Sequence, residues 1–162
     1  MLSKLLSSQR VIYNFILFIS FSLSVNYFVD LKFINFFAYV IFHLTLIYLV
    51  FYFFNFYLFF ISFAYGIFFD IFLINFISPH LISFVVFIFL FYYSKKYLLN
   101  FSSRVISYII FVITISLFIL QTFIANLLFN YPINIENLGW ILLTLIIIFF
   151  PLLLIFSKID KF

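Results

Sequence analysis

The sequence predicts an all-α integral membrane protein, a single polytopic domain over residues 1–162 that crosses the bilayer six times. Apolar residues make up 69% of the chain and charged residues 7%, against about 45–50% and about 25% in ordinary soluble domains. So few charged side chains cannot cover the surface of a soluble domain. Polar residues also divide the chain into runs of about 20 apolar residues, the length that crosses ~30 Å of hydrocarbon. Because the chain has no cysteine, a disulfide-stabilised module and thiol chemistry are excluded as well.

The first three spans are defined by charges and by length. One apolar run lies between Arg10 and Asp30. The next run extends from Phe33 to Ile77, which is too long for one crossing, so we expect a turn near Phe54-Asn55 to divide it. The predicted spans are 11–29, 33–53 and 56–77. A signal peptide is the other interpretation of the first span, but no small-residue cleavage site precedes Asp30.

The last three spans are defined by proline, asparagine and lysine. Ser78-Pro79-His80 indicates a helix start, because proline is favoured in the first turn of a helix. Lys95-Lys96 closes that span, Asn130-Tyr131-Pro132 ends the fifth, and Lys158 follows the sixth. The predicted spans are 80–97, 105–129 and 138–157.

The distribution of basic residues supports six crossings with both termini in the cytoplasm. Of the eight basic residues, only Lys32 then lies outside, which is the bias that sets membrane orientation. The seven inner ones are Lys4, Arg10, Lys95, Lys96, Arg104, Lys158 and Lys161. Five crossings would place the 95–104 loop opposite the N-terminal basic residues. We therefore expect a multi-pass membrane protein that binds lipid rather than nucleic acid.

Asp70 is the most informative polar residue, because carboxylates inside membranes are costly and usually face the bundle interior. Asn55, Ser62, Gly66 and Asp70 project on one side of the third span, and a small residue every fourth position lets helices approach closely. We interpret this face as the helix-packing and partner seam of the bundle. A proton or ion pathway, and a hydrated Asp70 at the outer interface, are the alternatives.

A second polar stripe follows the fifth span at intervals of seven, through Ser107, Thr114 and Gln121. Such side chains can join helices by hydrogen bonds, so we expect packing here; a ligand-lined groove is the alternative. The sequence has two histidines, His43 and His80, on different segments, and no ligand cluster at metal-binding spacing. We therefore expect no metal, no cofactor and no catalytic residue, and we expect His80 to lie at the interface without a specific role.

The segment Ser62-Phe-Ala-Tyr-Gly66-Ile-Phe-Phe-Asp70, followed by Ser78-Pro79-His80-Leu81, resembles the signature of the rod-shape-determining membrane protein family MreD. That family carries a Gly-xxx-Gly-xxx-Asp helix and then a short polar turn. Ser62 stands where the family often has glycine. The chain length, the six predicted spans and the expected cytoplasmic N-terminus are also similar to MreD.

The resemblance implies a non-enzymatic scaffold of the cell-elongation machinery in the bacterial cytoplasmic (inner) membrane. MreD-like proteins bind the bitopic protein MreC, and through it they influence the polymerase and transpeptidase of peptidoglycan synthesis and, indirectly, the MreB filaments that support rod shape. The family is also similar in fold to the substrate-binding subunits of energy-coupling-factor vitamin transporters. A substrate-binding subunit of a small-molecule transporter is therefore the alternative function.

Overall fold

The computed structural model describes residues 2–26, 32–98 and 100–160, with side chains from Gln9 onward. Every regular element in these ranges is helical. Three charged positions used to predict the topology, Asp30, Lys161 and the side chain of Lys4, lie outside the described residues. The all-α class is therefore observed directly in the part of the chain that the structure describes.

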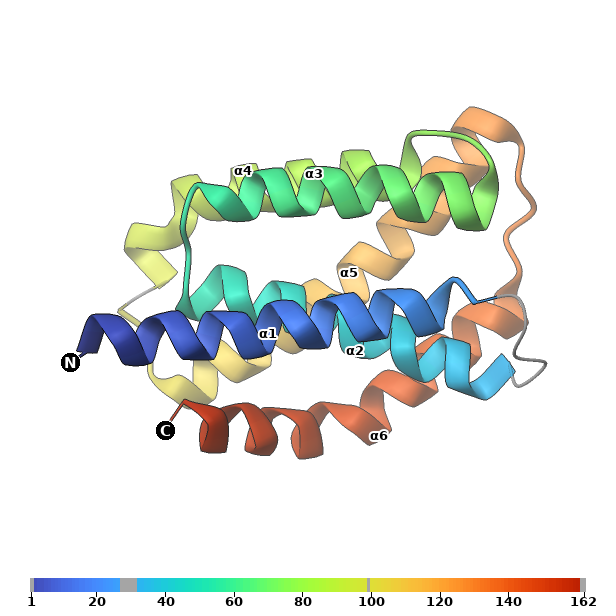
Figure 1. The fold of residues 1–162 in the computed structure, drawn as a ribbon. Helices are drawn as coiled ribbons and strands as arrows, with labels where there is room; N and C mark the ends of the chain where they lie inside the picture. The colour runs from blue at the N-terminus through green and yellow to red at the C-terminus, as the bar shows by residue number, and fades with distance from the viewer. Residues whose placement is uncertain (1, 27–31, 99, 161–162) are drawn as a thin grey trace. The chain divides into compact units, whose positions relative to one another are not determined.

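Six α-helices and one π-helical turn follow one another in the part of the chain that the structure describes (Figure 1). They are α1 (Leu2–Ser24), α2 (Lys32–Tyr52), α3 (Tyr57–Phe69), the π-helical turn η1 (Asp70–Ile74), α4 (Pro79–Leu98), α5 (Ser103–Phe129) and α6 (Ile135–Ile159). The segment between α2 and α3 contains Phe54-Asn55. Asn75 and Asn130 cap the C-terminal ends of η1 and α5 and adopt left-handed φ angles of 61° and 52°. Asparagine tolerates this conformation better than most residues.

Among the described residues, five helical segments are long and apolar enough to cross a membrane. They are Lys32–Tyr52, Tyr57–Ile74, Pro79–Leu98, Ser103–Phe129 and Ile135–Ile159. Their lengths and compositions are those of a multi-pass membrane protein. The sixth predicted span, 11–29, falls on α1 and extends beyond the described residues, so a crossing there stays a prediction.

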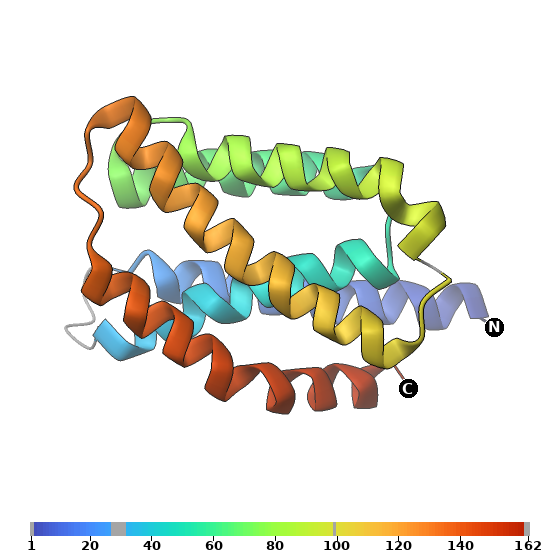
Figure 2. The ribbon, with the colours of Figure 1, turned by 180° about the vertical axis from the view of Figure 1, so that it is seen from behind.

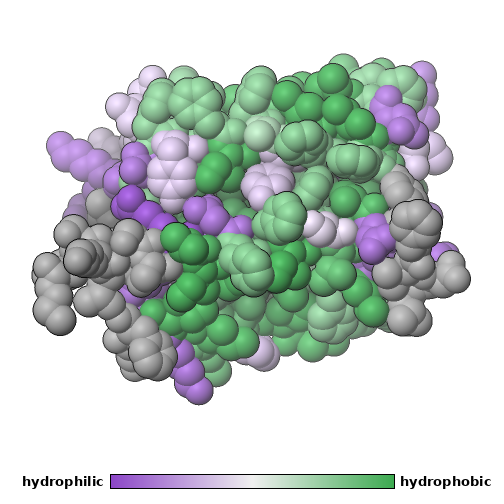
Figure 3. Space-filling model, in the orientation of Figure 1, coloured by the Kyte–Doolittle hydropathy of each residue, from purple (hydrophilic) through white to green (hydrophobic). Residues whose placement is uncertain are grey.

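The surface agrees with this composition. Large apolar side chains are widely exposed along the helices, among them Phe18 at 60% and Ile146 at 63%. Figure 3 shows that hydrophobic residues dominate the face it presents, with most of the hydrophilic residues near helix ends. Lipid, rather than water, is the solvent that such a surface fits.

The chain forms two compact units. Unit 1 comprises Met1–Leu49 and Glu136–Phe162, and unit 2 comprises Val50–Ile135. The sequence predicts that the two units form one continuous membrane domain, and this stays a prediction.

Unit 2 is built on the hairpin of α3 and α4, with α5 packed against α4. Figure 2 shows α5 crossing α4 obliquely, whereas α3 and α4 run alongside one another. Phe69 and Phe84 are fully buried in this hairpin and meet edge to face, with ring centroids 6.4 Å apart. Unit 2 therefore positions the α3–α4 seam on which the candidate site lies.

In unit 1, residues of α1, α2 and α6 meet in an aromatic cluster. Tyr13 and Phe156 are fully buried, and Tyr48 is 5% exposed. The Tyr13 ring lies 5.4 Å from that of Phe156 and 5.7 Å from that of Tyr48. The three helices thus share one core at the end of unit 1 that holds the C-terminal turn of α6.

Candidate functional site

Asp70 is fully buried and its carboxylate accepts four hydrogen bonds from the start of α4. The backbone N–H groups of Ser78 and His80 donate to Oδ2 and Oδ1, each over 2.8 Å. The backbone N–H of Leu81 donates to Oδ2 over 3.1 Å, and the His80 Nδ1–H donates to Oδ1 over 2.8 Å. Both oxygens are therefore engaged by groups 8–11 residues further along the chain.

This arrangement satisfies backbone N–H groups at the N-terminus of α4. The first N–H groups of a helix have no partner within it and carry a partial positive charge. Pro79, the first residue of α4, has no N–H to satisfy, and Asp70 accepts those of the residues around it. The carboxylate thus caps α4 from the end of α3, and the positive end of α4 compensates its charge.

Gly66 permits the close approach that this cap requires. A Cβ added at Gly66 would lie 2.7 Å from the Leu81 Cα and 3.1 Å from the Leu81 nitrogen. Both are backbone atoms, so no side-chain rotation can relieve the overlap. We use the name α3–α4 clamp for Gly66, Asp70 and the segment Ser78–Leu81.

His80 is part of this clamp, so the expectation that it lies at the interface without a specific role was wrong. Its side chain is buried, forms an ion pair with Asp70 when protonated, and stacks on Phe69 with ring centroids 5.4 Å apart and planes 24° apart. A carboxylate ten residues before His80, with Pro79 starting a helix between them, is the sequence signal that could have indicated this role.

The other two predicted seam residues, Ser62 and Asn55, lie in different surroundings. Ser62 is fully buried on the same face of α3, one turn before Gly66, and its hydroxyl has no hydrogen-bond partner among the described residues. Asn55 does not belong to this face: it is exposed in the turn before α3, where its Oδ1 accepts the N–H of Phe56 over 2.7 Å. The helical projection fails there because α3 begins only at Tyr57.

The second stripe lies on α5 with unequal burial. Thr114 and Gln121 are buried, whereas Ser107 is half-exposed. The hydroxyls do not join neighbouring helices as expected: Thr114 donates to the Ile110 carbonyl over 2.7 Å and Ser107 to the Ser103 carbonyl over 3.0 Å. Serine and threonine in a helix can reach the carbonyl one turn earlier, and this competes with interhelical bonding.

Sequence reasoning missed a second polar cluster, which lies in unit 1. The Asp160 carboxylate accepts hydrogen bonds from the hydroxyls of Tyr13, over 2.6 Å, and of Tyr48. The Gln9 amide donates to the carbonyls of Ile159 and Asp160 over 3.4 and 3.1 Å. The cluster holds the end of α6 against α1 and α2, and its partners are too far apart in sequence for any local pattern to reveal it.

No protein-family model, curated protein or solved structure matches this chain. The fold and the clamp describe a multi-pass helical membrane protein whose buried carboxylate joins two helices.

Proposed function

We propose that the chain is a non-enzymatic scaffold of the bacterial cell-elongation machinery, similar to MreD. In this proposal it crosses the cytoplasmic membrane six times as a bundle similar to the transporter substrate-binding subunits, with both termini in the cytoplasm. It binds an MreC-like bitopic protein and thereby supports lateral peptidoglycan synthesis and, indirectly, the MreB filaments.

The observation that carries the proposal is that the signature residues have a common structural task. Gly66 admits the backbone of Leu81, and Asp70 binds the residues from Ser78 to Leu81. Both carboxylate oxygens are used in holding the hairpin, as a scaffold requires, rather than left open to a mobile proton or ion. The signature is therefore better explained by helix placement than by transport chemistry.

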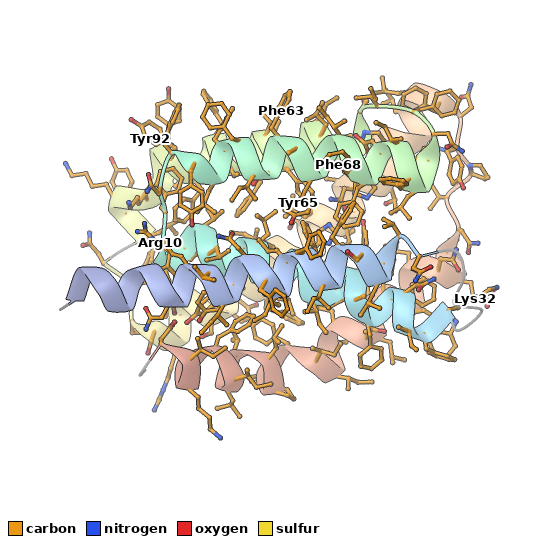
Figure 4. The ribbon with its side chains drawn as sticks, viewed as in Figure 1. Arg10, Lys32, Phe63, Tyr65, Phe68 and Tyr92 are labelled. Carbon is orange, nitrogen blue, oxygen red and sulfur yellow. The ribbon has the colours of Figure 1, made fainter. Side chains whose placement is uncertain are left out.

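The hairpin leaves an apolar outer face on which a single transmembrane helix can pack. Phe60 and Phe63 of α3 are 62% and 45% exposed, and Figure 4 shows Phe63 pointing away from the body of unit 2. Because lipid supplies little hydrophobic drive between helices, such packing depends on shape and dispersion. A rigid hairpin is what provides a constant shape.

Depletion and co-purification in the host test this proposal. Depletion should convert rod-shaped cells to spheres, and the intact chain should co-purify with an MreC-like protein. Gly66→Leu should abolish co-purification by separating α3 from α4, whereas Gly139→Leu, at a site where an added Cβ meets nothing within 4 Å, should preserve it. The amount of each variant in the membrane is measured in parallel.

Two outcomes would contradict the proposal. If the Gly66→Leu chain binds the MreC-like protein at full yield, the clamp does not shape the partner surface. If the purified chain instead retains a vitamin and depletion leaves cell shape unchanged, the transporter alternative is correct.

A further inference from the structure

Unit 1 contains an open apolar groove between α1 and α2, with a cavity volume of about 450 Å³. This lies within the ~300–1,000 Å³ of typical small-molecule sites. Its walls run from Ile16 to Leu23 on α1 and from Phe33 to Ile41 on α2, and Ser20 and Ala38 lie between them. We call this the α1–α2 groove.

The lining is suited to a hydrocarbon. Ser20 is its one polar lining residue, and its hydroxyl donates to the carbonyls of Ile16 and Leu17 over 2.7 and 3.2 Å. Its single O–H donor is therefore used within α1. An occupant gains contact area from this groove but no polar anchor.

The length of the groove favours a lipid chain over a transmembrane helix. At a rise of ~1.5 Å per residue, its two walls are about 10–12 Å long. One leaflet contributes about half of the ~30 Å hydrocarbon thickness. A groove of this length can hold most of the acyl chain of one leaflet, whereas a crossing helix would need the full thickness.

One end of the groove lies beside residues of the types that are common at membrane interfaces. Phe33 meets Trp140 edge to face, with ring centroids 5.2 Å apart, and tryptophan is enriched at the headgroup level. Lys32 precedes Phe33 at the start of α2 (Figure 4), and Glu136 lies one turn before Trp140 on α6. Both are exposed, and neither has an ion-pair partner in the described ranges.

We propose that the α1–α2 groove binds a phospholipid with a zwitterionic, amine-bearing headgroup, of the phosphatidylethanolamine type. One acyl chain fills the groove, Lys32 binds the phosphate, and Glu136 binds the ammonium group. The pair of opposite charges at this end favours such a headgroup over an anionic one, which would meet repulsion at Glu136. This inference does not depend on the proposed scaffold function.

Native mass spectrometry of the full chain in detergent tests the proposal, with phosphatidylethanolamine and phosphatidylglycerol added separately. Phosphatidylethanolamine should bind the unaltered chain at least about tenfold more tightly, equivalent to ~1.4 kcal/mol. Lys32→Gln should weaken both lipids, and Glu136→Gln should remove the preference. Ile34→Trp, which fills the groove from a wall residue that is 39% exposed, should abolish binding of both.

Matched variants control for folding and for general charge. Phe15→Trp places the same side chain on the exposed outer surface of α1, and Lys158→Gln removes a charge from the other end of α6. Both should bind like the unaltered chain, and all variants should keep the same helical circular dichroism. Equal binding of the two lipids to the unaltered chain, or full binding by a folded Ile34→Trp chain, would overturn the proposal.

Discussion

The sharpest consequence of the clamp is that the two glycines of the chain respond to alanine in opposite directions. An alanine Cβ at Gly66 would lie 2.7 Å from the Leu81 Cα, where ordinary contact begins at 3.4 Å. The start of α4 must therefore move by about 0.7 Å, the difference between these two distances. The same Cβ at Gly139 meets nothing within 4 Å.

The expected loss of stability can be worked out from this displacement. Overpacking of a fitted contact costs about 1–3 kcal/mol. The bond from the Leu81 N–H to Asp70, 3.1 Å long, would stretch beyond hydrogen-bonding distance, and a bond to a charged group contributes about 1.5–3 kcal/mol. After the ~0.5–1 kcal/mol that alanine gains over glycine in a helix, we expect Gly66→Ala to lower the free energy of unfolding by about 1.5–5.5 kcal/mol.

The assay is reversible unfolding in mixed micelles, followed by circular dichroism as the fraction of denaturing detergent rises. Gly139→Ala is the matched control, and it should raise stability by about 0.5–1 kcal/mol because it changes only helix propensity. The reasoning is refuted if Gly66→Ala unfolds at the same detergent fraction as the unaltered chain, or shifts in the same direction as Gly139→Ala.

Three further predictions follow from individual hydrogen bonds, each measured by the same unfolding assay. Asp70→Asn should lower the free energy of unfolding by about 1.5–3 kcal/mol, because the new amide presents N–H groups to backbone donors. Full stability of this variant would contradict the capping role. Tyr13→Phe and Asp160→Asn should show a coupling of about 0.5–3 kcal/mol in a double-mutant cycle; simple additivity would mean that the two side chains do not act on one another. Thr114→Val should cost less than about 1 kcal/mol, since its hydroxyl bonds within its own helix; a larger loss would indicate an interhelical bond.

The sequence predicts the helical class and much of the α3 seam, because apolar runs and a repeat of four are local signals. Gly66 and Asp70 follow from that repeat, and they lie together against the start of α4. The prediction for Asn55 is wrong because the helical projection counts it as part of α3, which begins only at Tyr57. The boundary depends on how the chain turns, which hydropathy does not encode.

The hydrogen bonds of Thr114 and Asp160 could not be predicted from the sequence, for a different reason. Thr114 satisfies its hydroxyl within its own helix, so a polar stripe does not imply a partner. Asp160, placed between lysines near the end of the sequence, has the pattern of a solvated charge, yet it is bound by tyrosines from two other helices. Contacts of this separation depend on the three-dimensional packing, which no local spacing reveals.

The position of Asp70 also has a consequence for biogenesis. During synthesis the carboxylate leaves the ribosome before the N–H groups that neutralise it, which follow 8–11 residues later. An isolated α3 entering lipid would carry this carboxylate without the partners that cap it in the folded chain. Insertion of α3 and α4 as a pair would therefore keep an uncapped Asp70 out of lipid.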